Sequence, residues 1–285
     1  MKKFKLGEFE RNSAIVFAVS MLANVVTYLY QIVMGNLLSP ADYGTINTLL
    51  SLSIVIGVPS GIISTLVATY TAKYQAVGKP ELIGGFMHKM LRASVLLACV
   101  VFAAGAALSS IIANVLQIEE TRYILATMVV VAFSCVAPVF SCTLQGVKRF
   151  VPYSINGVLN IAIRLLLSIP FVRMGFGIGG NLAAVILAAF ATAAFCFWCA
   201  RDLFFAPKIE QLHLDRTEIR RYFVSTFWFQ LFLLLMANGD VLLIKTFAAD
   251  PAEVGIYSSG SVIGKISLYL ANAIVPVLLP LAHAR

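Results

Sequence analysis

Charged residues are scarce in this chain, and their scarcity excludes an ordinary soluble domain. Of the 285 residues only 12% are charged, whereas 60% are hydrophobic, and the mean hydropathy is +0.91. A soluble domain carries about 25% charged residues, because polar side chains have to cover its core. The chain has too few for that purpose, and we therefore expect an all-α polytopic membrane protein.

Clustered carboxylates and spaced histidines are also missing, which argues against an enzyme. A membrane sugar transferase that uses a metal would need several acids close together. The seven acids of the expected cytoplasmic segments are instead scattered or paired only by chance, and the three histidines share no ligand spacing. The sequence therefore predicts no catalytic residues, no metal site and no cofactor. The net charge of +8 is distributed between apolar stretches and forms no single patch, so we expect no nucleic-acid partner.

Long apolar stretches predict eight transmembrane helices, because about 20 apolar residues cross a bilayer. The expected spans are residues 13–38, 43–71, 90–116, 123–146, 153–173, 181–200, 222–247 and 254–282. We expect residues 1–200 to form a six-helix N-terminal lobe and residues 201–221 to form a cytoplasmic linker. Residues 222–285 would then supply the first two helices of a truncated second lobe.

Basic residues alternate between the two sides of the expected membrane. The N-terminus, the C-terminus and the segments 72–92, 147–152 and 201–221 hold 16 of the 21 Lys and Arg residues. Because cytoplasmic loops carry an excess of such residues, we predict that both termini are cytoplasmic. The expected location is the cell membrane, inner or plasma, as a multi-pass protein.

A short motif occurs twice in the same register. Residues 40–44 read Pro-Ala-Asp-Tyr-Gly, and residues 251–255 read Pro-Ala-Glu-Val-Gly, 211 residues later. Each follows an apolar stretch and precedes another, which is typical of a transporter built from two repeated lobes. Pro, Ala, acid and Gly are also common in turns, so a chance match is the alternative.

Asn156, Asn160 and Arg164 are spaced four residues apart in the fifth expected span and therefore share one helix face. A charge near mid-membrane costs at least ~2.5 kcal/mol, so Arg164 should face a cavity or a partner. One interpretation is a cationic site for a pyrophosphate, whose oxygens a guanidinium can bind in pairs. The other is a buried pair with Asp240.

Further polar residues within spans are candidates for the same cavity. Lys265 and Asn272 lie on one face of the last span, and Asn24 and Gln31 are the largest polar residues of a stripe on the first. That stripe could equally serve helix packing. Asp240, beside Asn238, is the only carboxylate within a span, which predicts either a proton or sodium coupling site or a structural anchor.

Proline and tyrosine mark bends and ends of the expected spans. Pro59 and Pro138 are expected to kink their helices, because proline lacks the backbone donor. Tyrosines near span ends are expected to form an aromatic belt at the membrane surfaces. These tyrosines are Tyr28, Tyr30, Tyr43, Tyr123, Tyr153 and Tyr222.

Four segments together give the chain a family resemblance. They are residues 38–44 (LSPADYG), residues 144–150 (LQGVKRF), residues 175–183 (GFGIGGNLA), and Asn238-Gly239-Asp240 followed by residues 253–257 (EVGIY). In this order and spacing the chain resembles the oligosaccharide flippases of the polysaccharide-export group. These belong to the superfamily that includes multidrug and toxin extruders and lipid II flippases. The resemblance extends over essentially all 285 residues.

The resemblance implies about 12 to 14 helices in two lobes around a central cavity. It implies a flippase that moves a polyprenyl-pyrophosphate-linked sugar from the inner to the outer leaflet by alternating access, for cell-surface polysaccharides such as O-antigen. Lipid-linked oligosaccharide, membrane lipids, a polysaccharide polymerase and glycosyltransferases are the partners expected. The expectation of only eight spans departs from that pattern. A multidrug or cation extruder, and a fragment or scaffold that does not transport, are the alternatives.

Overall fold

The computed structural model describes residues 6–78, 81–205 and 216–265, with side chains from residue 18 and from residue 222 in the first and last ranges. Every secondary-structure element within these ranges is helical, which confirms the all-α class. The elements are α1 (Leu6–Leu37), α2 (Pro40–Ile56), α3 (Val58–Ala76), α4 (Glu81–Ala107), α5 (Ser109–Val115), α6 (Thr121–Gly146), α7 (Phe150–Phe171), η1 (Val172–Phe176), α8 (Gly177–Phe204), α9 (Arg216–Phe247) and α10 (Pro251–Gly264).

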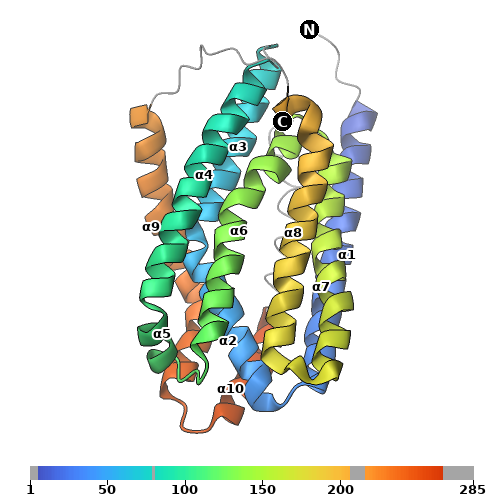
Figure 1. Cartoon of the computed structure of the whole chain (residues 1–285). Coiled ribbons are helices and arrows are strands. Elements are labelled where there is room, and N and C mark those ends of the chain that lie inside the picture. Colours follow the sequence, from blue (N-terminus) through green and yellow to red (C-terminus); the bar gives the residue numbers. More distant parts are fainter. Residues whose placement is uncertain (1–5, 79–80, 206–215, 266–285) are drawn as a thin grey trace.

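The long helices run up and down in one bundle (Figure 1). α3, α6 and α8 finish at the upper end of this view. Lys73 and Arg201 stand in the last turns of α3 and α8, and Arg149 precedes α7, so we call it the basic end. Pro40 and Pro251 lie at the lower end, where α2 and α10 begin, and we call it the proline end. Successive long helices therefore run in alternating directions between the basic end and the proline end.

Within the described residues, five helical stretches are long and apolar enough to cross a membrane, or six if α2 and α3 count as one span. A multi-pass membrane protein is therefore confirmed. The expected eighth span, residues 254–282, begins in α10 but lies mostly outside the described residues. The number eight stays a prediction, as does the division of the chain into lobes and linker.

One of these stretches, Phe150–Phe204, has 55 residues and is a helical hairpin. A single helix of that length would measure about 80 Å, far more than a bilayer. Gly175 and Gly177 have φ angles of 89° and 49°, a conformation that other residues rarely adopt, and the chain reverses there. α7 and α8 then lie side by side (Figure 1). The glycines of the third family segment thus close this hairpin.

The second expected span is broken. α2 ends at Ile56 and α3 begins at Val58, with a bend of 50° between their axes. Pro59 stands in the first turn of α3, where a missing backbone donor costs nothing. The kink expected near Pro59 is therefore present as a full break, whereas α6 is assigned as one helix through Pro138.

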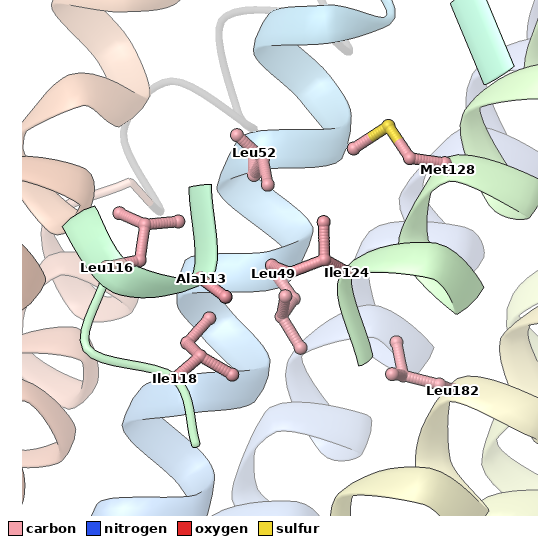
Figure 2. Packing of buried hydrophobic residues seen from close by; sticks show 8 residues of the cluster. All are labelled: Leu49, Leu52, Ala113, Leu116, Ile118, Ile124, Met128 and Leu182. Carbon is pink, nitrogen blue, oxygen red and sulfur yellow. The ribbon is translucent and has the colours of Figure 1, made fainter. Parts of the chain in front are cut away.

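α2 presents two different faces. Leu49 and Leu52 pack into an apolar cluster with side chains of α6, α8 and the α5 region (Figure 2). The other members of this cluster are Ala113, Leu116, Ile118, Ile124, Met128 and Leu182. The opposite face of α2 carries Asn47 and Ser51, which line a cavity. The cluster therefore anchors α2 so that its polar face points into the bundle.

The two repeated motifs form the same local structure at the proline end. Ser39 caps α2 by accepting a hydrogen bond from the backbone of Asp42, and Asp250 caps α10 by accepting one from Ala252. In both helices proline occupies the first turn. The motifs begin helices that point the same way and contact each other (Figure 1).

Candidate functional site

A central cavity of about 630 Å³ lies among α1, α2, α6, α7, α8 and α9 and reaches the end of α10. Six of the site residues predicted from the sequence lie on its wall: Gln31, Asn156, Asn160, Arg164, Asn238 and Lys265. Asp240 and Asn24 are half-buried and do not line it. Asn272 lies outside the described residues.

Arg164 is held in this cavity by an aromatic residue. Its Nη2 donates a hydrogen bond of 2.8 Å to the hydroxyl of Tyr30, and its guanidinium carbon lies 4.0 Å from the centre of the Tyr30 ring. The Arg164 Nε atom is buried and has no hydrogen-bond partner. Neither ion pair found among the described residues involves Arg164. Its positive charge is therefore oriented but not neutralised.

Tyr30 belongs to a buried polar network that the sequence did not reveal. The Tyr30 hydroxyl and the Asn181 side chain are hydrogen-bonded at 2.7 Å, and Asn181 also contacts Ser168 Oγ at 3.3 Å. Tyr30 is only 1% exposed, so its expected place in an aromatic belt at the membrane surface is wrong. Tyr43 is likewise buried. Both tyrosines face inward because their hydroxyls find polar partners there.

Lys265 is the second cation on the cavity wall. Its Nζ atom donates a hydrogen bond of 3.2 Å to Asn238 Oδ1. Asn238 is itself buried and donates to the Leu234 carbonyl oxygen of its own helix. An amide oxygen is a neutral acceptor, so it does not neutralise the ammonium group. Arg164 and Lys265 thus face one cavity from α7 and from the end of α10.

Asp240 does not line the cavity, and it contacts α10. Its Oδ2 atom accepts hydrogen bonds from the Tyr257 hydroxyl at 3.0 Å and from Ser261 Oγ at 3.1 Å. Its Oδ1 atom is buried and has no partner. The alternative pairing of Arg164 with Asp240 is not observed, because Arg164 binds Tyr30. Asp240 instead ties α9 to α10 close to Lys265.

Toward the proline end, hydrogen-bonded side chains and close helix contacts adjoin the cavity. The Tyr43 hydroxyl donates to Gln31 Oε1 at 3.0 Å, and Gln31 Nε2 donates to Asn47 Oδ1 at 3.4 Å. Beside them, the backbones of Gly44 and Gly255 touch where α2 crosses α10. Asn47 was missed in the sequence because it carries no charge and stands alone among apolar and small residues.

No group of three or more His, Cys, Asp or Glu residues in the described ranges is arranged to hold a metal ion. The described wall of the central cavity also carries no carboxylate. Its chemistry is therefore that of two cations among amides and hydroxyls. Such a wall can bind an anionic group and hydrogen-bond to its neutral neighbours.

A helical bundle of this size with a polar cavity between apolar spans has the architecture of a membrane transporter. A family model described as polysaccharide biosynthesis protein matches residues 9–283. The chain therefore belongs to this family, as its resemblance to the polysaccharide-export group predicted. None of the curated proteins compared with the chain matches it in sequence.

Solved transporter structures share the fold. A MATE protein crystallised in complex with Br-NRF superposes with a TM-score of 0.69 at 16% identity, covering 93% of this chain and 64% of that one. An inward-facing multidrug resistance MATE transporter of the MOP superfamily superposes with a TM-score of 0.61 at 15% identity. The match covers 92% of this chain and 59% of that transporter. A MOP superfamily transporter from Pyrococcus furiosus superposes with a TM-score of 0.62 at 17% identity. The match covers 94% of this chain and 61% of that transporter.

The chain therefore spans about 60% of the length of these transporters. The family match and the shared fold together assign it to the multidrug/oligosaccharidyl-lipid/polysaccharide exporter superfamily. Members of this superfamily are transporters, which supports the expectation that the chain is not an enzyme.

Proposed function

We propose that this chain is a lipid-linked oligosaccharide flippase, moving a polyprenyl-pyrophosphate-linked sugar from the inner to the outer leaflet. One observation carries the proposal: Arg164 and Lys265 line one cavity whose described wall holds no carboxylate. A pyrophosphate brings negative charges that two cations in a poorly solvated site can bind strongly. Membership of the polysaccharide biosynthesis family supports a sugar as the remainder of the ligand.

We base the proposed direction of transport on the distribution of basic residues and on the helix contacts at the proline end. Basic residues gather at the basic end, which favours its placement in the cytoplasm by the positive-inside rule. Tyr43, Gly44 and Gly255 make close contacts at the proline end, and we infer that these contacts close the cavity there. Loading would therefore occur from the cytoplasmic side, in alternating access between the two ends. The polymerase and glycosyltransferases of the same biosynthetic process are the proposed protein partners.

A multidrug or cation extruder is the second candidate, and the fold shared with MATE transporters supports it. A cationic substrate would need acids on the cavity wall, and Asp240 is not among the described residues that line it. The positive charge of the described cavity wall therefore favours an anionic substrate. For transport that is driven by an ion, we propose Asp240 and Asn238 as the proton or sodium site, because they link α9 to α10 beside Lys265.

The proposal is tested by neutralising each cation in the purified chain. We expect Arg164→Gln and Lys265→Gln each to weaken binding of undecaprenyl pyrophosphate about 10- to 100-fold, because a hydrogen bond to a charged group contributes about 1.5–3 kcal/mol. Binding is measured in lipid nanodiscs, and flipping of a fluorescent analogue in liposomes is measured in parallel.

Arg173→Gln is the matched control, because this arginine is exposed and lies off the cavity wall. It should bind the lipid as the wild type does. Unchanged affinity in both cavity variants contradicts the flippase, and a cationic dye that binds the wild type in preference to the lipid would favour the extruder.

A further inference from the structure

A second cavity of about 550 Å³ adjoins the central one toward the basic end. It lies among α1, α3, α6 and α7 and shares Ser141, Asn156 and Gly157 with the central cavity. Among the described residues its wall carries no charge, and most of its polar groups are hydroxyls, so we call it the hydroxyl cavity. Its other polar members include Ser20, Ser64, Thr65, Thr69, Gln145 and Ser154.

Two polar atoms on this wall lack partners. Ser154 is 9% exposed, and its Oγ atom has no hydrogen bond. The Oδ1 atom of Asn156, two residues along α7, is also buried without a partner. A buried polar atom left unpaired costs about 1–3 kcal/mol, and few are found in native proteins. Both residues line the hydroxyl cavity, and a ligand bound there is one source of the missing partners once either side chain rotates toward it.

The remaining wall suits a neutral ligand with many hydroxyls. Ser64 Oγ donates to the Ser60 carbonyl oxygen at 2.8 Å, and Thr65 Oγ1 donates to that of Gly61 at 3.1 Å. Their lone pairs therefore remain available as acceptors, while Gln145 offers both a donor and an acceptor. Such a wall has no cation to hold a phosphate, but it can pair with sugar hydroxyls, which both donate and accept.

We propose that the hydroxyl cavity is the glycan subsite of the transporter and binds the sugar units that follow the pyrophosphate. This inference rests on the proposed function, in which Arg164 and Lys265 hold the pyrophosphate itself. Ser154 and Arg164 are ten residues apart on α7, about 15 Å along the helix. One extended ligand can therefore contact both, with its charged group at the centre of the bundle and its sugars toward the basic end.

The test compares three ligands of the purified chain in nanodiscs: undecaprenyl pyrophosphate, the same lipid carrying N-acetylglucosamine, and free N,N′,N″-triacetylchitotriose. The variant combines Ser154→Ala with Gln145→Met. We expect the wild type to prefer the sugar-bearing lipid about tenfold, since each added hydrogen bond contributes about 0.5–1.5 kcal/mol. The double variant should lose that preference and bind the bare lipid as before. Arg164→Gln should weaken both lipids equally.

Thermal unfolding separates a ligand site from a structural role. Ser154→Ala removes an unpaired buried group, so it should leave the unfolding temperature of the ligand-free chain unchanged or raise it. Thr127→Val is the control, because this buried hydroxyl of α6 lies off both cavities and bonds to the carbonyl oxygen of Tyr123. It should leave the sugar preference intact.

The glycan subsite is overturned if the double variant keeps the preference or loses affinity for both lipids equally. If the wild type binds neither lipid, the proposed flippase fails. In that case binding of the free trisaccharide tests the glycan subsite by itself. The subsite is supported if the wild type binds the trisaccharide and the double variant does not, and it is overturned if the wild type does not bind the trisaccharide.

Discussion

A hydroxyl and an aromatic face orient Arg164 inside the bundle, and neither ion pair among the described residues involves it. A carboxylate would neutralise the guanidinium and leave little attraction for an anion. The Tyr30 hydroxyl accepts a hydrogen bond, and its ring faces the cation, so both orient Arg164 while its charge remains. Asn181, which is fully buried, fixes the Tyr30 hydroxyl in turn.

This arrangement predicts the effect of removing one oxygen atom. Tyr30→Phe retains the ring but leaves Arg164 and buried Asn181 without their shared acceptor. We expect it to lower the free energy of unfolding by about 1–3 kcal/mol and to weaken pyrophosphate binding. Equilibrium unfolding in detergent and lipid binding measure the two effects. Tyr28→Phe, at an exposed tyrosine two residues away, should change neither. Full stability of Tyr30→Phe would show that the hydroxyl does not position Arg164.

At the scale of elements, the close crossing of α2 and α10 depends on two glycines. A Cβ atom added at Gly255 would lie 2.0 Å from the Pro40 carbonyl oxygen, and one added at Gly44 would lie 2.7 Å from the Gly255 nitrogen. Both obstacles are backbone atoms, which no side-chain rotation can move. The repeated glycines therefore allow the two helices to close the proline end.

Gly255→Ala should separate these helices and lower the free energy of unfolding by about 1–3 kcal/mol, the usual cost of overpacking. Gly260→Ala, on the same helix with no atom within 4 Å of the added Cβ, is the matched control. There alanine should be neutral or stabilising by up to about 1 kcal/mol, because it favours helix. Thermal unfolding of the two variants compares them, and equal stability would mean that α2 and α10 do not pack this closely.

At the scale of the whole molecule, an ion at Asp240 would influence the cavity through α10. Asp240 binds Tyr257 and Ser261 of α10, and the same helix leads to Lys265 on the cavity wall. Protonation or sodium binding would change these hydrogen bonds and so the position of α10. This helix also forms the contact that closes the proline end, which provides a physical link between an ion and the closure.

We expect Asp240→Asn to abolish the dependence of lipid flipping on an imposed proton or sodium gradient while lipid binding persists. Flipping is measured in liposomes with and without each gradient. Glu253→Gln, an exposed carboxylate in the first turn of α10, should retain the dependence. If Asp240→Asn responds to the gradients as the wild type does, Asp240 has no coupling role and serves as a structural anchor.

Patterns along the chain predicted much at the level of single helices. Hydropathy located the long helices, and four-residue spacing placed Asn156, Asn160 and Arg164 on one face, where all three line the cavity. The buried roles of Tyr30, Asn47 and Asn181 could not be predicted in this way. The partner of each belongs to another helix or an earlier turn, so no periodic pattern marks the pairing.

The sequence by itself determined the membrane class, the family and the polar faces, because hydropathy, composition and helical period are local properties of the chain. Only the tertiary structure decided that Arg164 and Lys265 share one cavity, that Asp240 does not line it and that Gly44 meets Gly255. Those relations join residues that are tens to hundreds of positions apart. They depend on how the helices pack against one another, which the order of residues in a single helix does not specify.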